Sequence, residues 1–244
     1  MKILVTGATG YVGGRLVPRL IAMGHEIVCL VRDPSHISGR GWEKVDVRCG
    51  DALDTGSLLP VMEGIDVAYY LIHSMARGEG KFEDRDRMAA ENFGMAASAA
   101  GVHRIIYLGG LGNADEALSP HLASRHEVGE ILRSSGVPVT EFRAPVIVGS
   151  GSISFEIIRY LAEGLPVMFA SRWMKTSCQP IAIANVLDYL ALALQEPGSV
   201  GRILEIGGPD VLSYREMIMG YASVRKLRRL LVPLPVLTPR LTPC

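Results

Sequence analysis

The sequence predicts an α/β fold: a doubly wound parallel sheet followed by a small C-terminal region. Three observations predict it. Short apolar runs alternate with longer segments of helical period, the runs are apolar almost throughout, and a glycine-rich turn follows the first of them. Near-continuous apolar runs are typical of parallel strands that helices cover on both faces. The order strand, helix, strand therefore repeats from the first residues of the chain.

The expected strands of the sheet are residues 2–5, 26–31, 45–48, 66–72, 104–108 and 139–142, and the helices between them are residues 11–23, 55–63, 83–100 and 121–135. In the first helix Val12, Leu16 and Leu20 repeat at helical spacing, which predicts one buried face.

The pattern changes after Arg143. Further helices are expected at residues 153–163, 183–195 and 213–221, with a strand at 202–206. Residues 1–143 are therefore predicted to form the core, and residues 144–221 a substrate or cap region that completes the same domain. Residues 222–244 form a proline-rich tail. From residue 232 on it has four prolines in thirteen residues, so we expect no regular structure there.

Composition excludes several classes of protein. The 244 residues carry 25 basic and 25 acidic side chains, so no overall positive field favours nucleic acid, and we expect no nucleic-acid partner. The four cysteines are widely spaced, which indicates reduced thiols and a cytoplasmic location. No signal peptide is recognisable at the N-terminus, and no apolar stretch reaches the roughly 18 residues of a membrane span.

The glycine turn carries the most specific signal. Gly7, Gly10 and Gly13 follow a predicted strand and lead into a predicted helix. At this spacing the first glycine permits a tight turn, the second lets a pyrophosphate approach the backbone, and the third lets the helix pack closely on the strand. The turn predicts a dinucleotide site. Thr9, Tyr11 and Val12 lie within it, and Tyr11 is expected to cover the phosphates.

The end of the second strand decides which dinucleotide is expected. An acidic residue there holds the ribose 2′-hydroxyl of NAD, whereas an arginine accommodates the 2′-phosphate of NADP. Arg32 stands directly after the strand, and Asp33, before Pro34, also suits a plain turn. We therefore expect NADP(H) rather than NAD(H), held by Arg32. The alternative is an exposed Arg-Asp pair without function.

Residues 7–13 (GATGYVG), 30–34 (LVRDP), 50–51 (GD) and 140–145 (TEFRAP) resemble the NAD(P)H-binding, NmrA-like or atypical branch of the short-chain dehydrogenase/reductase superfamily, over about residues 1–221. The resemblance implies a Rossmann core, and related sequences continue beyond a tail of this kind, so the chain is expected to be a truncated or short form. The resemblance also implies a set of cofactor contacts: Asp51 and Ala52 at the adenine, Leu71, Ile72 and His73 beneath the ribose, and Pro145 and Val146 near the nicotinamide.

The superfamily's catalytic serine, tyrosine and lysine are missing. Gly109 and Gly110 follow the fifth strand where the hydroxyl residue belongs, and His121 and Arg125 take the places of the tyrosine and lysine. Arg125 keeps a cation for the ribose, but it cannot relay a proton because arginine does not deprotonate.

His121 suits acid-base chemistry at neutral pH, yet the first turn of a helix is often exposed. His73 is a second candidate proton donor, and water a third. Asp84 and Asp86 lie in a charged helix start, which is typical of a solvated face.

Three functions stay open: an NADP(H)-dependent oxidoreductase of an unknown small organic substrate, a non-catalytic NADP(H) sensor or assembly factor, and a sugar-nucleotide epimerase or dehydratase. No metal site is expected, because His126-Glu127 lacks the second histidine of the H-E-x-x-H zinc motif. Residues 225–232 mix basic and apolar side chains, which leaves membrane contact of the tail open. The sequence does not predict an oligomeric state.

Overall fold

The computed structural model describes residues 1–42, 44–72, 82–112, 118–170 and 172–233. The chain forms two compact units. The first contains Met1–Arg143 and Leu187–Glu205, and the second contains Ala144–Val186 and the chain from Ile206 onward.

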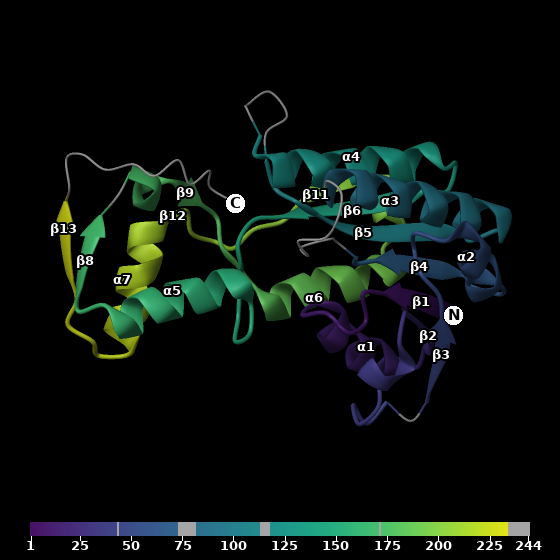
Figure 1. Ribbon diagram of the computed structural model, residues 1–244, viewed down its shortest axis with the longest axis horizontal. Helices are drawn as coiled ribbons and strands as arrows, with labels where there is room; N and C mark the ends of the chain where they lie inside the picture. The colour runs from purple at the N-terminus through teal and green to yellow at the C-terminus, as the bar shows by residue number, and fades with distance from the viewer. Residues whose placement is uncertain (43, 73–81, 113–117, 171, 234–244) are drawn as a thin grey trace. The chain divides into compact units, whose positions relative to one another are not determined.

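A seven-stranded parallel sheet forms the centre of the first unit, in the order β11-β6-β5-β4-β1-β2-β3 (Figure 1). The strands are β1 (Lys2–Thr6), β2 (Glu26–Val31), β3 (Val45–Cys49), β4 (Val67–Tyr70), β5 (Arg104–Gly110), β6 (Val139–Ala144) and β11 (Ile203–Glu205). The chain order reverses between β1 and β4, and ligands bind beyond the carboxyl ends of such strands at this point. The predicted doubly wound parallel sheet is confirmed.

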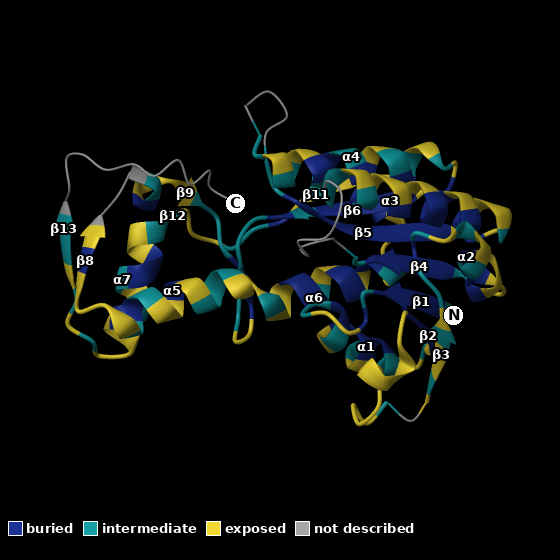
Figure 2. Ribbon diagram, viewed as in Figure 1, coloured by how far each residue is buried: buried dark blue, intermediate teal, exposed yellow. Residues whose placement is uncertain are grey.

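Helices cover both faces of the inner strands β1, β2, β4, β5 and β6, as the burial of these strands shows, while the edge strands β3 and β11 are partly exposed (Figure 2). The helices are α1 (Gly13–Ala22), α2 (Thr55–Met62), α3 (Phe82–Ala99), α4 (Pro120–Ser134) and α6 (Ile183–Leu192), with the short helices η1 (Pro34–His36), η3 (Ala193–Gln195) and η4 (Pro197–Ser199). Two neighbouring residues of β4 contact helices on opposite faces of the sheet. Tyr70 packs edge-on against Phe93 of α3, with ring centroids 4.9 Å apart, while Tyr69 Oη donates to Leu190 O of α6 at 2.8 Å.

The segment Leu187–Glu205 corrects the boundary expected from the sequence. It was assigned with the C-terminal region, but its strand β11 extends the first unit's sheet beside β6. The buried Arg104 of β5 holds this segment, because its Nη1 donates to Ala193 O and its Nη2 to Ser199 Oγ, both at 2.6 Å.

The second unit contains α5 (Ile153–Gly164), α7 (Tyr214–Val224), η2 (Arg172–Lys175) and three two-stranded sheets. The strands of these sheets are β7 (Ile147–Val148), β8 (Val167–Ala170), β9 (Ser177–Cys178), β10 (Ile181–Ala182), β12 (Leu212–Ser213) and β13 (Leu230–Pro233). Ile158 and Ala162 of α5 and Ile218 of α7 are buried in its core.

Strand β13 corrects the expectation of an irregular tail, because it pairs with β8 through Val232 and Pro233. Proline is tolerated there because each strand has only one partner in this sheet and Pro233 is the last residue of β13. The rest of the tail lies outside the described residues. Within the described ranges, no helix has both the length and the apolar character needed to cross a membrane.

Candidate functional site

The glycine turn joins β1 to α1 and has no room for a side chain at Gly7 or Gly13. Gly7 has a φ of +67°, and a Cβ on it would lie 2.5 Å from Leu71 O. A Cβ on Gly13 would lie only 2.3 Å from Gly7 O. Gly10 N donates to Gly7 O at 2.9 Å and closes the turn. The backbone between Gly7 and Gly13 is therefore packed against the end of β4 and against the start of α1.

The N-terminus of α1 is open to an anion. Val12 is its N-cap, no described side chain caps it, and its first turn has no acidic residue. The first N–H groups of a helix lack intrahelical acceptors and carry a partial positive charge. This arrangement fits a pyrophosphate at the turn.

Arg32 follows β2 as an exposed cation. Its guanidinium has no hydrogen bond or ion pair to any residue that the structure describes, and Asp33 does not neutralise it. Asp33 Oδ1 instead accepts from Ser35 N at 2.9 Å and caps η1, and this hydrogen bond lowers the pKa of the Asp33 carboxyl. Arg32 is thus available for an anion.

Asp51 and Ala52 lie beside Arg32, because β3 and β2 pair with Val31 opposite Cys49. Asp51 Oδ1 accepts from Leu53 N at 3.0 Å, and Ala52 is buried. Asp51 and Ala52, which are expected at the adenine, therefore follow β3 next to the position where Arg32, which is expected at the 2′-phosphate, follows β2.

The end of β4 contacts the glycine turn. Leu71 N donates to Thr6 Oγ1 at 3.2 Å, and Leu71 and Ile72 are half-buried. They follow β4 at the point where a ribose is expected. His73 lies outside the described residues.

Arg125 of α4 lies at the carboxyl end of β5. Its Nη2 donates to Leu108 O at 2.6 Å, and its buried Nε has no acceptor among the described residues. A Cβ on Gly110 would lie 2.7 Å from Leu122 Cδ2 and 3.4 Å from Arg125 Cδ. Two side chains of α4 thus occupy the space beside Gly110, one of the two glycines that stand where the resemblance implies a hydroxyl residue.

His121 lies one helical turn before Arg125 and is half-buried. Burial, and then the charge of Arg125, lower the pKa of His121, while Asp86 opposes them. The imidazole is therefore mainly neutral at pH 7. It is better suited to accept a proton, or to donate one that is resupplied, than to hold a permanent positive charge.

Asp86 corrects one expectation from the sequence. It is 7% exposed, not solvated, and its Oδ2 accepts from Ser124 Oγ of α4 at 3.3 Å. The helix packing of α3 against α4 buries it. Only a helical wheel that puts Asp86 on the face of Ala89, Ala90 and Phe93 would have indicated this.

Arg40 is a contact of the glycine turn that the sequence does not indicate. Its Nη2 donates to Thr9 O in the glycine turn at 3.1 Å, although the two residues are 31 positions apart. It lies between Gly39 and Gly41 in a loop with no periodicity, so no local signal could have indicated the contact.

Pro145 and Val146 belong to the second unit, where Val146 O accepts from Ile181 N at 3.0 Å. Their expected position near the nicotinamide stays a prediction. Within the described chain, no group of three or more His, Cys, Asp or Glu side chains is placed to hold a metal ion.

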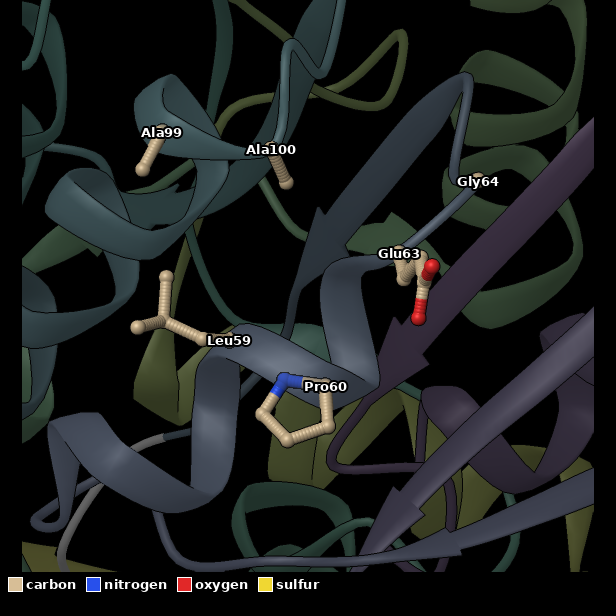
Figure 3. A pocket seen from close by; sticks show the side chains of 6 residues that line it. All are labelled: Leu59, Pro60, Glu63, Gly64, Ala99 and Ala100. Carbon is tan, nitrogen blue, oxygen red and sulfur yellow. The ribbon is translucent and has the colours of Figure 1, made fainter.

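A depression of 390 Å³ lies elsewhere on the first unit (Figure 3). It is lined by Leu59, Pro60, Glu63, Gly64, Ala99 and Ala100. Because α2 leads into β4 and α3 leads into β5, the C-terminal ends of these helices lie where the strands begin, at the amino ends of the parallel strands. The glycine turn follows the carboxyl end of β1, so the depression lies at the opposite end of the strands from it.

Comparison with known proteins agrees with this geometry. The family model for NAD(P)H-binding proteins matches residues 7–159. One relative, the (4-alkanoyl-5-oxo-2,5-dihydrofuran-3-yl)methyl phosphate reductase of Streptomyces griseus, is 29% identical over 218 residues, covering 88% of this chain and 70% of that protein. The mitochondrial NADH dehydrogenase [ubiquinone] 1 alpha subcomplex subunit 9 of Arabidopsis thaliana is 27% identical over 248 residues, covering 95% of this chain and 60% of that protein.

Two solved structures share the fold. The triphenylmethane reductase of Citrobacter sp., complexed with NADP(H), has a TM-score of 0.78 at 21% identity, covering 96% of this chain and 79% of that chain. The NADPH-dependent quinone oxidoreductase of Escherichia coli, complexed with NADPH, has a TM-score of 0.78 at 22% identity, covering 95% and 78%. With the family model matched over most of the chain, and with the glycine turn, the open helix end and the parallel sheet in place, this protein belongs to the NAD(P)H-binding family.

Proposed function

We propose that this protein is an NADP(H)-dependent oxidoreductase that acts on a small organic substrate. The observation that carries the proposal is Arg32, an exposed guanidinium at the end of β2 that pairs with no residue in the described part of the chain, together with an intact glycine turn. A planar guanidinium can bind a phosphate with two hydrogen bonds, whereas NADH has no 2′-phosphate to bind. The reductases among the relatives and structural neighbours support the reaction class.

Different residues of the chain would bind different parts of the cofactor. The N–H groups between Gly7 and Gly13 would hold the pyrophosphate, and Arg32 the 2′-phosphate. Asp51 and Ala52 would meet the adenine, and Arg125 would anchor the ribose through the donors not used by Leu108. NADPH, when bound, supplies a hydride.

Proton delivery would come from His121 or from water, with His73 as a further candidate. The lowered pKa of His121 means that it holds little proton at pH 7, so it would act as a donor only when it is reprotonated from solvent. Arg125 cannot exchange a proton and would only orient.

A non-catalytic NADP(H) sensor or assembly factor is the second candidate. The observation that favours it is the packing at Gly110, where Leu122 occupies the space that a side chain would need. The relative named as a subunit of a mitochondrial NADH dehydrogenase supports it as well. An epimerase or dehydratase function has less support, because His121 replaces the tyrosine that such enzymes need.

Two measurements test the proposal. Calorimetry with NADPH and NADH should show NADPH preferred, and Arg32→Met should remove most of this preference. A preference for NADH, or an unchanged NADPH affinity in Arg32→Met, would contradict the assignment of NADP(H). Stopped-flow oxidation of NADPH against enones, quinones and aldehydes should then identify a substrate. Tight binding without turnover across that panel would favour the sensor.

We also propose a cytoplasmic location. Cys29, Cys49 and Cys178 are free thiols, which suits a reducing compartment. Cell fractionation with an antibody to the native protein tests it, and recovery in a secreted or membrane fraction would refute it.

A further inference from the structure

Arg40 contacts the glycine turn from the loop between β2 and β3. Its guanidinium is fixed by two main-chain acceptors: Nη2 donates to Thr9 O and Nε donates to His36 O, each at 3.1 Å. The ring of Trp42 lies below it, with 5.2 Å from Cζ to the ring centroid. Three contacts of this kind hold a long, flexible side chain in one orientation.

The charge of Arg40 is not neutralised by these contacts, because carbonyl oxygens and an aromatic ring are uncharged. No carboxylate forms an ion pair with it within the described part of the chain. The described acidic groups nearest to this loop in the sequence are engaged otherwise: Asp33 accepts from Ser35 N, and Asp46 accepts from Arg48 Nε, both at 2.9 Å, while Glu43 lies outside the described residues. Arg40 is therefore an oriented cation with spare donors.

The spare donors lie against the start of α1. A Cβ on Gly14 would come within 2.8 Å of Arg40 Nη1, and Nη1 donates to no described residue. The guanidinium thus lies against the glycine turn and the start of α1, and its Nε contacts His36 O in the segment that follows β2 and Arg32. In a sheet of this topology the 2′-phosphate of NADP is bound near the end of the second strand.

We propose that Arg40 is a second cation for the 2′-phosphate of NADP(H), acting with Arg32 as a specificity-determining residue. This inference rests on the proposed function, since it concerns the same cofactor. Arg32 would bind the phosphate from the end of β2, and Arg40 from the glycine turn. Two guanidiniums bind a dianionic phosphate more selectively than one because they satisfy more of its acceptor oxygens.

The experiment is calorimetric titration of the full chain with NADPH and with NADH, in wild type and in Arg40→Met. We expect Arg40→Met to weaken NADPH binding about tenfold, the size of one lost charge-assisted hydrogen bond, and to change NADH binding less than about twofold. Lys44→Met is the matched control, because it removes an exposed cation from the same loop that has no contact with the turn in the described structure. It should leave the ratio of the two affinities unchanged.

Gly14→Ala provides a second variant that keeps the charge. Its Cβ would displace the end of the Arg40 side chain rather than backbone, so folding should be preserved, and the preference for NADPH should fall. The NADPH affinity of wild type should also decrease with salt more steeply than that of Arg40→Met.

The results separate the two proposals. Equal weakening of NADPH and NADH in Arg40→Met would mean that Arg40 only ties the loop to the turn, and no change in either would mean that it does not contact the cofactor; both overturn the inference. If wild type binds neither dinucleotide, the proposed function itself fails. If wild type prefers NADPH and only Arg32→Met removes that preference, the proposed function stands and the role of Arg40 is refuted.

Discussion

Gly13→Ala tests whether the close packing of α1 on the glycine turn is required for stability and for NADPH binding. A Cβ at this position would lie 2.3 Å from Gly7 O, 2.8 Å from Gly7 C and 2.9 Å from Ala8 Cα. The first distance is about 0.7 Å below the 3.0 Å that real Cβ contacts keep. All three neighbours are backbone atoms, so no side-chain rotation can relieve the overlap, and α1 must move away from β1.

The expected cost follows from two opposing effects. Alanine favours a helix over glycine by about 1 kcal/mol, whereas overpacking costs typically about 1–3 kcal/mol and more when backbone must move. We expect a net loss of about 2 kcal/mol, and a thermal midpoint lowered by roughly 4–8 °C for a chain of this size. NADPH affinity should fall about tenfold or more, because the turn's N–H donors lose their alignment.

Thermal unfolding followed by circular dichroism measures the first effect, and calorimetry with NADPH measures the second. Gly220→Ala is the matched control, since Gly220 lies within α7 with nothing within 4 Å of its would-be Cβ. That variant should be stabilised by about 1 kcal/mol and should bind NADPH as wild type does. A Gly13→Ala protein with the midpoint and the NADPH affinity of wild type would refute the packing argument.

Three further predictions concern titratable groups. Glu141 is fully buried and pairs with two arginines, so Glu141→Gln should lower the free energy of unfolding in urea by about 3 kcal/mol; a loss below about 1 kcal/mol would show that the arginines are resolvated freely. Burial and then Arg125 lower the pKa of His121 below its ordinary 6.5, so as the pH drops the unfolded chain protonates at this histidine before the folded chain does. The free energy of unfolding should therefore fall as the pH drops below about 6.5, and His121→Gln should reduce that fall. Identical profiles of stability against pH for the variant and wild type would contradict this prediction. Burial raises the pKa of the Cys29 thiol to about 12, so a thiol reagent followed by mass spectrometry should modify the exposed Cys49 first and Cys29 only after denaturation; early labelling of Cys29 would be inconsistent with its burial.

The main elements of the first unit followed from the sequence because their signals are local. The strand at residues 26–31 was predicted with the bounds of β2, and the helix at residues 55–63 differs from α2 by one residue. Periodicity and near-continuous apolar runs are properties of neighbouring residues, so they can be recognised in the sequence without knowledge of the fold. The short strands of the second unit were missed because strands of two to four residues have too few positions to show a period.

The candidate site could be predicted only in part, for a related reason. The glycine turn and Arg32 are defined by spacing along a strand-turn-helix unit. Arg40 and Asp86 depend on contacts made across long stretches of chain: Arg40 with Thr9, 31 residues away, and Asp86 with Ser124, 38 residues away. Such contacts are set by tertiary packing, so the sequence contains no local signal for the partner of either residue, although the helical spacing of α3 does place Asp86 on its buried face.

Neighbouring side chains occupy the space beside the glycines of β5. A Cβ on Gly109 would lie 3.3 Å from Glu141 Oε1, and one on Gly129 would lie 2.5 Å from Glu141 Oε2. The buried Glu141 carboxylate thus occupies space between β5, β6 and α4 that glycines leave open, while Leu122 fills the space beside Gly110. A serine at residue 110 would therefore push against α4, and it would not create a proton relay because Arg125 cannot deprotonate. Kinetics of His121→Gln against wild type test whether His121 transfers a proton at this end of the sheet: a loss of turnover would assign the transfer to His121, and unchanged turnover would assign it to another group or to water.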